Sequence, residues 1–297
     1  TSVVSYIPSG LKSIWDDYFG LCKPRVVAVL LLTAVVGMFL AGPSLQDATS
    51  MILATLGIGL CASSAAAFNH VVDRRFDAVM YRTNKRPLPS GRLTSKQAII
   101  FASAIGAIGF IVLYVWVNPL TAYLTLVSLV GYALIYTAFL KRATPQNITI
   151  GGLAGAAPPL LGWVAVSGQF EANSLLLVLI IFAWTPPHFW ALAIHKREDY
   201  ARAGIPMLPV THGVEFTKIQ ILLYTLLMIL TTALPFLVGM SGVIYLFGVA
   251  ILNMRFLYFS LRLFGGDDAV PLKMFWYSIR YIMWLFAFLL IDHYVSF

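Results

Sequence analysis

Residues 51–77 read MILATLGIGLCASSAAAFNHVVDRRFD, an apolar run that ends in a mixture of acids, bases and one amide. The apolar part has about the 20 residues that a helix needs to cross a bilayer. The whole chain of 297 residues shares this character, since 60% of its residues are hydrophobic and only 11% are charged. Soluble domains carry about 25% charged residues. The sequence therefore predicts an all-α polytopic membrane protein, because lipid offers the backbone no hydrogen bonds and favours helices.

Nine apolar segments follow one another along the chain, at residues 26–41, 50–69, 97–116, 119–139, 148–167, 174–194, 218–239, 242–263 and 272–295. Eighteen of the twenty lysines and arginines fall in the amino-terminal segment and in alternate connections. The other two, Arg255 and Arg280, lie inside the last two segments toward the same side. Because basic residues mark cytoplasmic loops, we expect the amino terminus in the cytoplasm and the carboxyl terminus outside. The net charge of +8 then belongs to one membrane face, and no nucleic-acid partner is expected.

Two connections, residues 70–96 and 195–217, are much longer than the others, and both lie on the basic side. Long loops in compact proteins tend to be functional. Paired prolines also occur inside two apolar segments, in GAAPPLLGW (155–163) and AWTPPHFW (183–190). Proline removes a backbone donor, which membrane helices tolerate where protein or a water-filled cavity covers the freed groups. Each pair therefore predicts either a packing kink or part of a cavity wall.

Asn69, Asp73 and Asp77 are spaced four residues apart, so that on a helix they form one stripe. Carboxylates one turn apart repel each other. Arg74 and Arg75 point elsewhere on the helix, so a metal ion is a good candidate for the compensating charge. Mg²⁺ binds one or two carboxylates and bridges to substrate phosphates. A solvated helix end with mixed charges would explain the two acids alone, and the asparagine one turn earlier favours the metal.

Basic residues expected on the same membrane face as these acids suit a diphosphate, whose departure a metal and bases together would assist. The candidate diphosphate contacts are Lys23, Arg25, Arg82, Arg86, Lys141 and Arg142. The second long connection supplies similar chemistry in HKREDY (195–200). An apolar helical cavity beneath such a site would hold a prenyl chain.

The pattern N-x₃-D-x₃-D, followed by RTNKRPLPSGR (82–92), resembles the UbiA-type superfamily of intramembrane prenyltransferases. The resemblance extends over nearly the whole chain, and it includes KPRVVAVLLLTAVVGM (23–38) and IYTAFLKRATPQNITIGGLAGAAPPLLGW (135–163). It implies a UbiA-type fold with about nine transmembrane helices around a central cavity. We expect residues 1–297 to form this fold as a single transmembrane domain.

Many members of the superfamily carry a second D-x₃-D in the loop after the sixth helix, where this chain has only Asp199, with Lys196 close by. The resemblance implies that both residues are catalytic, together with Asn69, Asp73 and Asp77. It also implies that Asp199 joins those three as a metal ligand. The departure from the second motif puts in doubt whether a second Mg²⁺ is held.

The segments WTPPHFWALA (184–193) and KREDYARAGIPMLPV (196–210) resemble the branch of the superfamily that modifies haem. That branch implies transfer of a farnesyl group from farnesyl diphosphate to a vinyl group of protohaem IX, with addition of water and with Mg²⁺ as cofactor. His188 is then a candidate ligand of the haem iron, although a buried histidine is more often a hydrogen-bonded core residue. The other histidines on the basic side, His70 among them, read as plain loop residues.

The implied partners are the two substrates, the lipid bilayer and a downstream haem-modifying enzyme or oxidase assembly factor. The expected location is a bacterial inner membrane, or the mitochondrial inner membrane in a eukaryote. Two other functions remain open from the sequence. One is a prenyltransferase that acts on an aromatic acid or a quinone precursor, which would differ only in its acceptor pocket. The other is a transporter with broken helices and charges at the midplane, whereas the acids here gather at one membrane face.

Overall fold

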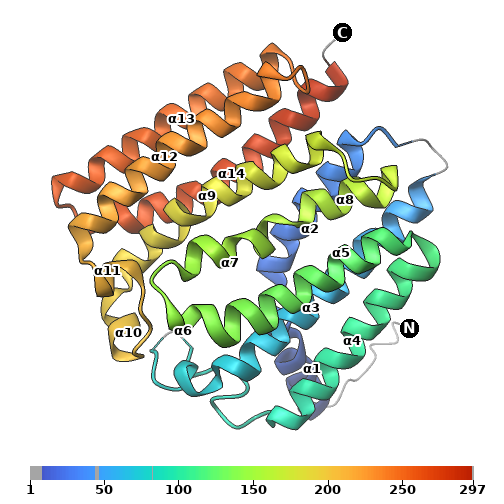
Figure 1. Ribbon diagram of the computed structural model, residues 1–297. Helices are drawn as coiled ribbons and strands as arrows, with labels where there is room; N and C mark the ends of the chain where they lie inside the picture. Colours follow the sequence, from blue (N-terminus) through green and yellow to red (C-terminus); the bar gives the residue numbers. More distant parts are fainter. Residues whose placement is uncertain (1–8, 44–46, 82, 296–297) are drawn as a thin grey trace, which may run out of the picture.

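The computed structural model describes residues 9–43, 47–81 and 83–295, and these residues form a bundle of helices (Figure 1). The α-helices are α1 (Ser9–Leu21), α2 (Pro24–Leu40), α3 (Ala48–Asp77), α4 (Ser95–Trp116), α5 (Pro119–Val130), α6 (Lys141–Ala143), α7 (Asn147–Ala156), α8 (Pro158–Ser167), α9 (Ala172–His195), α10 (Arg197–Arg202), α11 (Leu208–Thr211), α12 (Val214–Leu237), α13 (Val243–Arg262) and α14 (Val270–Val295). A π-helical stretch, Gly131–Leu140, joins α5 to α6, and a 3₁₀ turn, Leu263–Gly265, follows α13.

Eight helical stretches of the described residues are long and apolar enough to cross a membrane, and a ninth is counted if α1 and α2 form one bent span. The two arms of that span meet at an angle of 47°. The bend follows from Pro24, whose ring disfavours the helical conformation for the residue before it. Lys23 accordingly has a left-handed backbone, with φ 49° and ψ 58°. Seven of the nine spans match the predicted apolar segments within a few residues and the first two extend beyond theirs, so the predicted polytopic helical fold is confirmed.

Helix α3 continues eight residues past the predicted apolar segment 50–69 and contains the whole stripe of Asn69, Asp73 and Asp77. It has 30 residues, about 45 Å at 1.5 Å per residue, and it ends at Asp77 rather than at residue 69. No glycine or proline occurs between residues 60 and 77, so nothing in the chain stops the helix at the end of the apolar run. The first long connection therefore begins only after Asp77. The second one is partly helical, because it contains α10 and α11.

Close contacts between helix backbones hold the centre of the bundle together. A Cβ atom on Gly37 of α2 would collide with the backbone of Pro159, and one on Gly162 of α8 would collide with that of Ala34. In the same way, a Cβ on Gly109 of α4 would lie 2.8 Å from the carbonyl oxygen of Gly57 on α3. Small residues at helix contacts are the usual means of close packing in membranes, where no hydrophobic force draws apolar helices together.

The two proline pairs have different effects on the helices that contain them. The first pair separates α7 from α8, since α7 ends at Ala156 and α8 begins at Pro158. Pro186 and Pro187 instead lie inside α9, which continues through them. Helices α7 and α9 meet nearby, where a Cβ on Gly152 would lie 2.8 Å from Cγ2 of Thr185.

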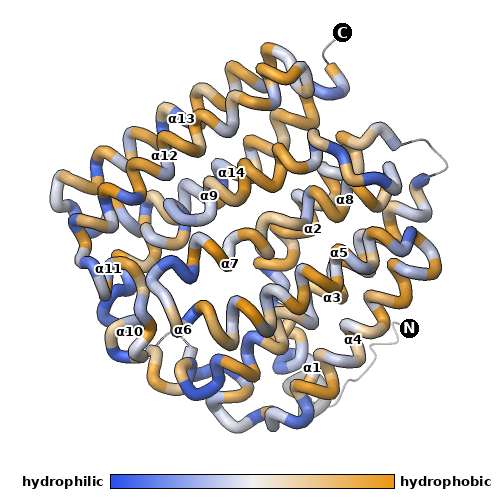
Figure 2. The backbone as a smooth tube through the Cα atoms, viewed as in Figure 1, coloured by the Kyte–Doolittle hydropathy of each residue, from blue (hydrophilic) through white to orange (hydrophobic). Residues whose placement is uncertain are grey.

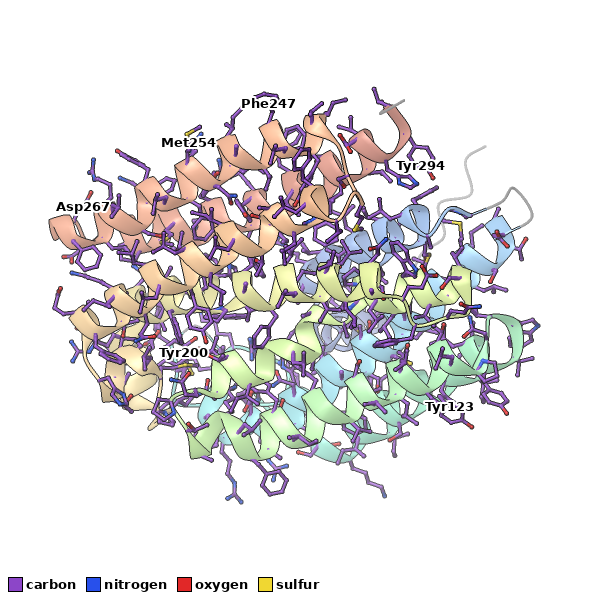
Figure 3. The ribbon with its side chains drawn as sticks, turned by 45° about the horizontal axis from the view of Figure 1, so that its top comes forward. Tyr123, Tyr200, Phe247, Met254, Asp267 and Tyr294 are labelled. Atoms are coloured by element: carbon purple, nitrogen blue, oxygen red, sulfur yellow. The ribbon has the colours of Figure 1, made fainter. Side chains whose placement is uncertain are left out.

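Polar residues are concentrated at one end of the bundle. Hydrophilic positions gather around α6, α10 and α11, whereas most positions along the long helices are hydrophobic (Figure 2). Asp267, between α13 and α14, also lies toward that end, and Tyr123 and Tyr294 lie toward the opposite one (Figure 3). We call the end with α6, α10, α11 and the α13–α14 turn the polar end.

Candidate functional site

The three residues of the predicted stripe lie on the last turns of α3, close to the polar end. Asn69, Asp73 and Asp77 are 4%, 3% and 5% exposed. All three point into the protein, as their spacing predicted, and not into solvent. A solvated helix end with mixed charges is therefore not what the structure contains, and two buried carboxylates require partners.

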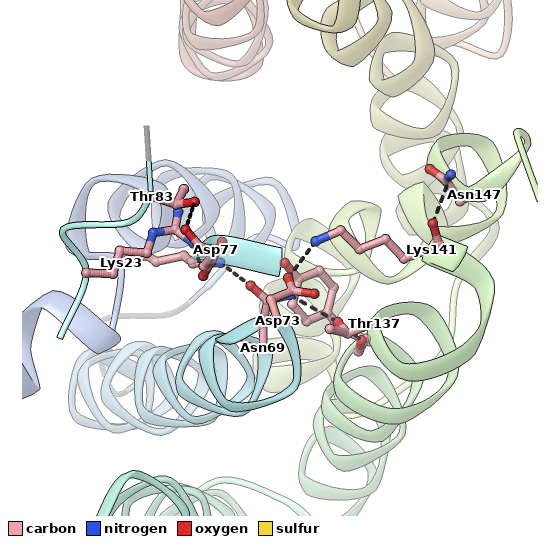
Figure 4. Close-up of polar contacts among 10 residues, drawn as sticks. Lys23, Asn69, Asp73, Asp77, Thr83, Thr137, Lys141 and Asn147 are labelled. Carbon is pink, nitrogen blue, oxygen red and sulfur yellow. Dashed lines mark hydrogen bonds and ion pairs between the residues drawn. The ribbon is translucent and has the colours of Figure 1, made fainter. Parts of the chain in front are cut away.

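Asn69 and Asp73 form one half of the cluster. The Asn69 amide nitrogen donates to Oδ2 of Asp73 at 3.0 Å and to Oγ1 of Thr137 at 3.3 Å. Nζ of Lys141 also donates to Oδ2 of Asp73, at 2.5 Å. On the other side, Nζ of Lys23 donates to Oδ1 of Asn69. Side chains from α3, the π-helical stretch, α6 and the α1–α2 bend thus meet at one point (Figure 4).

Asp77 and the segment that follows α3 form the other half. Nη1 of Arg86 lies 2.8 Å from Oδ2 of Asp77, and the hydroxyl of Thr83 donates to the Asp77 carbonyl oxygen at 3.0 Å. These bonds fold the chain after α3 back over the end of the helix. The compensating charge expected from a metal ion is supplied in this structure by Arg86 and by Lys141.

The cluster carries more positive than negative charge. Two carboxylates, Asp73 and Asp77, face the three basic residues Lys23, Arg86 and Lys141. The geometry therefore favours a further anion at this point of the bundle.

Several buried polar atoms in the cluster have no hydrogen-bond partner. They are Oδ1 of Asp73 and both ring nitrogens of His70. His70 is 2% exposed and lies on α3, close enough to Lys23, Arg86 and Lys141 to interact with their charges. Its interpretation as a plain loop residue was wrong, because α3 continues past residue 69. Buried polar atoms without partners are rare in folded proteins, and each requires an explanation.

The remaining candidate residues lie in different places. Arg25 is exposed on α2. Lys196 immediately precedes α10, and Asp199 lies on α10, 3.7 Å from Arg202. Among the described residues, no hydrogen bond or ion pair joins Lys196 or Asp199 to the α3 cluster, and no three His, Cys, Asp or Glu residues converge as metal ligands. Arg82 and the side chain of Arg142 lie outside what the structure describes.

His188 lies about two turns before the carboxyl end of α9 and is 7% exposed. Its ring is stacked between Trp184 and Phe275, whose centroids lie 4.3 and 4.7 Å away. Its Nδ1 lies 2.6 Å from the hydroxyl oxygen of Ser278. Ser278 donates its own proton to the Phe275 carbonyl oxygen at 2.7 Å, so Nδ1 must be the donor in the first bond. This network leaves the lone pair of the imidazole on Nε2, the arrangement found in metal-ligating histidines.

Comparison with known proteins finds matches that extend over most of the chain. The model of the UbiA prenyltransferase family matches residues 30–288. A protoheme IX farnesyltransferase from Marinobacter nauticus is 60% identical over 282 residues, which cover 95% of this chain and 93% of that protein.

Two solved structures share the fold. A structure of digeranylgeranylglyceryl phosphate synthase has a TM-score of 0.78 at 17% identity, with 94% of this chain and 98% of that one covered. A UbiA homolog from Archaeoglobus fulgidus bound to DMAPP and Mg²⁺ has a TM-score of 0.61 at 17% identity, with 92% and 99% covered.

Proposed function

Because the chain belongs to the UbiA prenyltransferase family, we propose that it transfers a farnesyl group from farnesyl diphosphate to protohaem IX. The observation that carries the proposal is the 60% identity to a protoheme IX farnesyltransferase along almost the full length of both chains. The product would be haem O, and diphosphate would be released. The protein is an integral membrane prenyltransferase, as the sequence predicted.

The charges of the α3 cluster support a site for the diphosphate and Mg²⁺. Two carboxylates against three bases leave one excess positive charge. Adding Mg²⁺ and a diphosphate ester with about three negative charges brings the sum close to zero, which a buried site requires. When diphosphate is present, Lys141 and Arg86 can turn from the carboxylates to the phosphate oxygens. Lys23 lies on the same side and would be a third contact.

The donor set of the cluster fits a hard cation. Carboxylate and amide oxygens are the ligands Mg²⁺ prefers, and Oδ1 of Asp73 is buried with no other partner. We infer that Asp73 and Asp77 hold the ion, with Asn69 completing the set after its amide turns. Asp199 would join them only if α10 moves toward α3. When bound, Mg²⁺ would act as a Lewis acid on the diphosphate oxygens.

The residues of this chain can assist the reaction without any covalent enzyme intermediate. Lys23, Arg86 and Lys141 would take up the charge that develops on the leaving diphosphate as the allylic C–O bond breaks. The vinyl group of the haem then forms a bond to the farnesyl carbon. Water adds to the cation left beside the porphyrin ring and loses a proton to solvent. Lys196 and Arg25 would contribute further positive charge, and Arg82 and Arg142 stay candidate contacts from the sequence alone.

His188 is the proposed contact to the haem iron, through its Nε2 lone pair. Trp184 and Phe275 hold the ring in place from both faces, and Ser278 fixes its tautomer. Haem would then lie between α9 and the α3 cluster, with its propionates toward the basic residues of the polar end, where an arginine can pair with a carboxylate through two hydrogen bonds.

We further propose that the polar end faces the cytoplasm, since it carries nearly all of the lysines and arginines. The amino terminus would then lie inside and the carboxyl terminus outside, in an inner membrane of a bacterium or a mitochondrion. The whole chain would act as one transmembrane domain and deliver its product to a downstream haem-modifying enzyme or oxidase assembly factor. Cysteines introduced at Thr94 and Glu171 should label from opposite faces, and labelling from one face would contradict this topology.

A direct assay tests the function. Purified protein in lipid nanodiscs, supplied with protohaem IX, farnesyl diphosphate and Mg²⁺, should yield a haem heavier by one farnesyl group plus water. The same assay without Mg²⁺ is the control for the metal. If haem stays unmodified while an aromatic acid or a quinone precursor is prenylated, the acceptor assignment fails and the family assignment stands.

A further inference from the structure

Two arginines on the outer surface of α13 and α14 take no part in the site described above. Arg255 lies seven residues before the end of α13, and Arg280 lies ten residues after the start of α14. At 1.5 Å per residue, they lie about 10 and 15 Å from the polar ends of their helices. Both side chains are exposed. They thus point out of the protein at a depth where apolar side chains otherwise cover the surface.

Neither arginine has an acidic partner in the part of the chain that the structure describes. The ion pair nearest to this place lies at the end of α13, where Nη2 of Arg262 is 3.9 Å from Oδ2 of Asp267. The guanidinium of Arg255 lies 5.2 Å from the centroid of the Tyr277 ring. An arginine in a membrane-spanning segment is costly unless it is paired, so both residues require a partner from outside the protein.

The two arginines lie on the same side of the helix pair. Tyr277 is close to Arg255, and its hydroxyl donates to the Leu252 carbonyl oxygen at 2.8 Å. Tyr281 instead turns inward, where its hydroxyl donates to Asn253. Residues three apart on a helix are neighbours, so Arg280 lies beside Tyr277, on the flank away from the inward-facing Tyr281. Arg255, Tyr277 and Arg280 therefore share the outer groove between α13 and α14.

The exposed surface of α13 and α14 has the composition of a lipid contact. Met254, Leu261 and Met283 are 65%, 54% and 43% exposed. Tyr258, Trp276 and Trp284 are 53%, 54% and 56% exposed. Tyrosine and tryptophan prefer the level of the headgroups, where one part of the ring is apolar and the other is wet. Apolar surface around a pair of cations fits a molecule with acyl chains and an anionic head.

We propose that Arg255 and Arg280 form a binding site for the headgroup phosphate of an anionic phospholipid. Guanidinium groups bind phosphate oxygens through paired, charge-assisted hydrogen bonds. Basic pockets between membrane helices on the positively charged side are known to bind anionic headgroups. The acyl chains lie along the apolar residues of α13 and α14, while Tyr277 holds the Arg255 guanidinium toward the headgroup. The site is separate from the α3 cluster and does not depend on the reaction proposed for it.

Lipid binding can be measured directly on the full chain. Wild-type protein, Arg255→Gln, Arg280→Gln and the double variant are transferred to nanodiscs of phosphatidylcholine with about 20% phosphatidylglycerol as the probe lipid. Native mass spectrometry then counts retained phosphatidylglycerol. Lys96→Gln, which removes one exposed positive charge from α4, is the matched control.

Each glutamine substitution should weaken phosphatidylglycerol retention about fivefold, the factor that corresponds to ~1 kcal/mol per basic residue near the membrane surface. Lys96→Gln should leave retention unchanged, and Arg280→Lys should keep most of it. Equal retention of phosphatidylglycerol by wild type and the double variant overturns the proposal. The two arginines would then be expected to bind a protein partner instead. Equal retention of phosphatidylcholine and phosphatidylglycerol by wild-type protein also overturns it, because the site would then not select for charge.

Discussion

Two buried polar clusters in this protein differ in how completely their atoms are paired. One is the α3 cluster, formed by Lys23, Asn69, His70, Asp73, Asp77, Arg86 and Lys141. The other, which we call the C-terminal network, is formed by Thr232, Tyr245, Asn253, Tyr281 and Asp292 of α12, α13 and α14. Both are buried and both join several helices, so burial and polarity alone do not distinguish a site from a structural contact.

Every side-chain polar atom of the C-terminal network has a partner. Asn253 donates to Thr232 at 3.0 Å and accepts from Tyr281 at 2.6 Å. The Tyr245 hydroxyl donates to the Thr232 carbonyl oxygen at 2.7 Å. The two oxygens of Asp292 accept from the backbone nitrogens of Gly242 and Tyr245, and so cap α13. The α3 cluster instead leaves Asp73 and His70 with unpaired atoms and has an excess of positive charge. The difference indicates that the C-terminal network stabilises the fold, whereas the α3 cluster awaits ligands.

The largest expected effect is the loss of turnover in Asp73→Asn and in Asp77→Asn. Each carboxylate is proposed to hold the metal, whose stabilisation of the transition state is worth several kcal/mol, on the order of a thousandfold in rate. Diphosphate release from farnesyl diphosphate measures the rate, and thermal unfolding in detergent checks that the variants fold. Near-native rates at saturating Mg²⁺ in either variant would contradict the metal assignment.

The second prediction concerns the C-terminal network, where a substitution should cost stability and leave the chemistry intact. Asn253→Ala removes the acceptor of the buried Tyr281 hydroxyl, at a cost of about 1–3 kcal/mol for the unpaired group, whereas the Thr232 hydroxyl keeps its bond to the Ile229 carbonyl oxygen. The midpoint of thermal unfolding should fall, while turnover per folded molecule stays near the wild-type value. A variant that is fully stable but inactive would remove the distinction between the two clusters.

His70→Leu should behave in the opposite way to Asn253→Ala. Replacing a buried polar group that has no partner by an apolar one of similar size costs little and can even stabilise. We expect unchanged or higher thermal stability, together with a KM for farnesyl diphosphate raised severalfold, since the charges of the cations that would hold the diphosphate act on His70. His70→Asn, which keeps a donor, is the control and should restore part of the affinity. A loss of stability without any change in KM would make His70 a structural residue.

Most of the fold followed from the sequence because its determinants are local. A run of about 20 apolar residues suffices to define a span, and the break at Lys23 could have been read from Pro24. The close approach of Gly37 to Pro159 and of Gly162 to Ala34 could not, because it depends on which helices become neighbours.

Only part of the candidate site could be predicted from the sequence, for the same reason. The stripe of Asn69 and Asp73 follows from helical spacing, but the ion pair of Lys141 with Asp73 joins residues 68 positions apart. Sequence reasoning missed His70 because it assigned residues 70–96 to a connection, although the stripe through Asp77 already implied a helix. The absence of glycine and proline up to Asp77 was the signal that the helix continues. It also missed Ser278, since a serine on α14 carries no sign of a partner on α9.

The smallest expected effect comes from Ser278→Ala. Ser278 lies on α14, which also carries part of the C-terminal network, and the substitution tests whether it supports haem binding through His188. Ser278 accepts from Nδ1 of His188 at 2.6 Å and thereby places the lone pair of the ring on Nε2. Removing its hydroxyl frees the imidazole to change tautomer, so the KM for protohaem IX should rise about two- to threefold, for a loss of ~0.5 kcal/mol within the range of one hydrogen bond. Ser260→Ala is the matched control. Ser260 is also a fully buried serine that bonds a side chain on a neighbouring helix, Thr225 at 2.8 Å, but it has no contact with a histidine. Both variants should lose similar stability, and only Ser278→Ala should change haem use or the absorption spectrum of bound haem. If the two variants behave alike in every assay, Ser278 belongs with the structural residues, and the proposed contact of His188 with the iron loses its support.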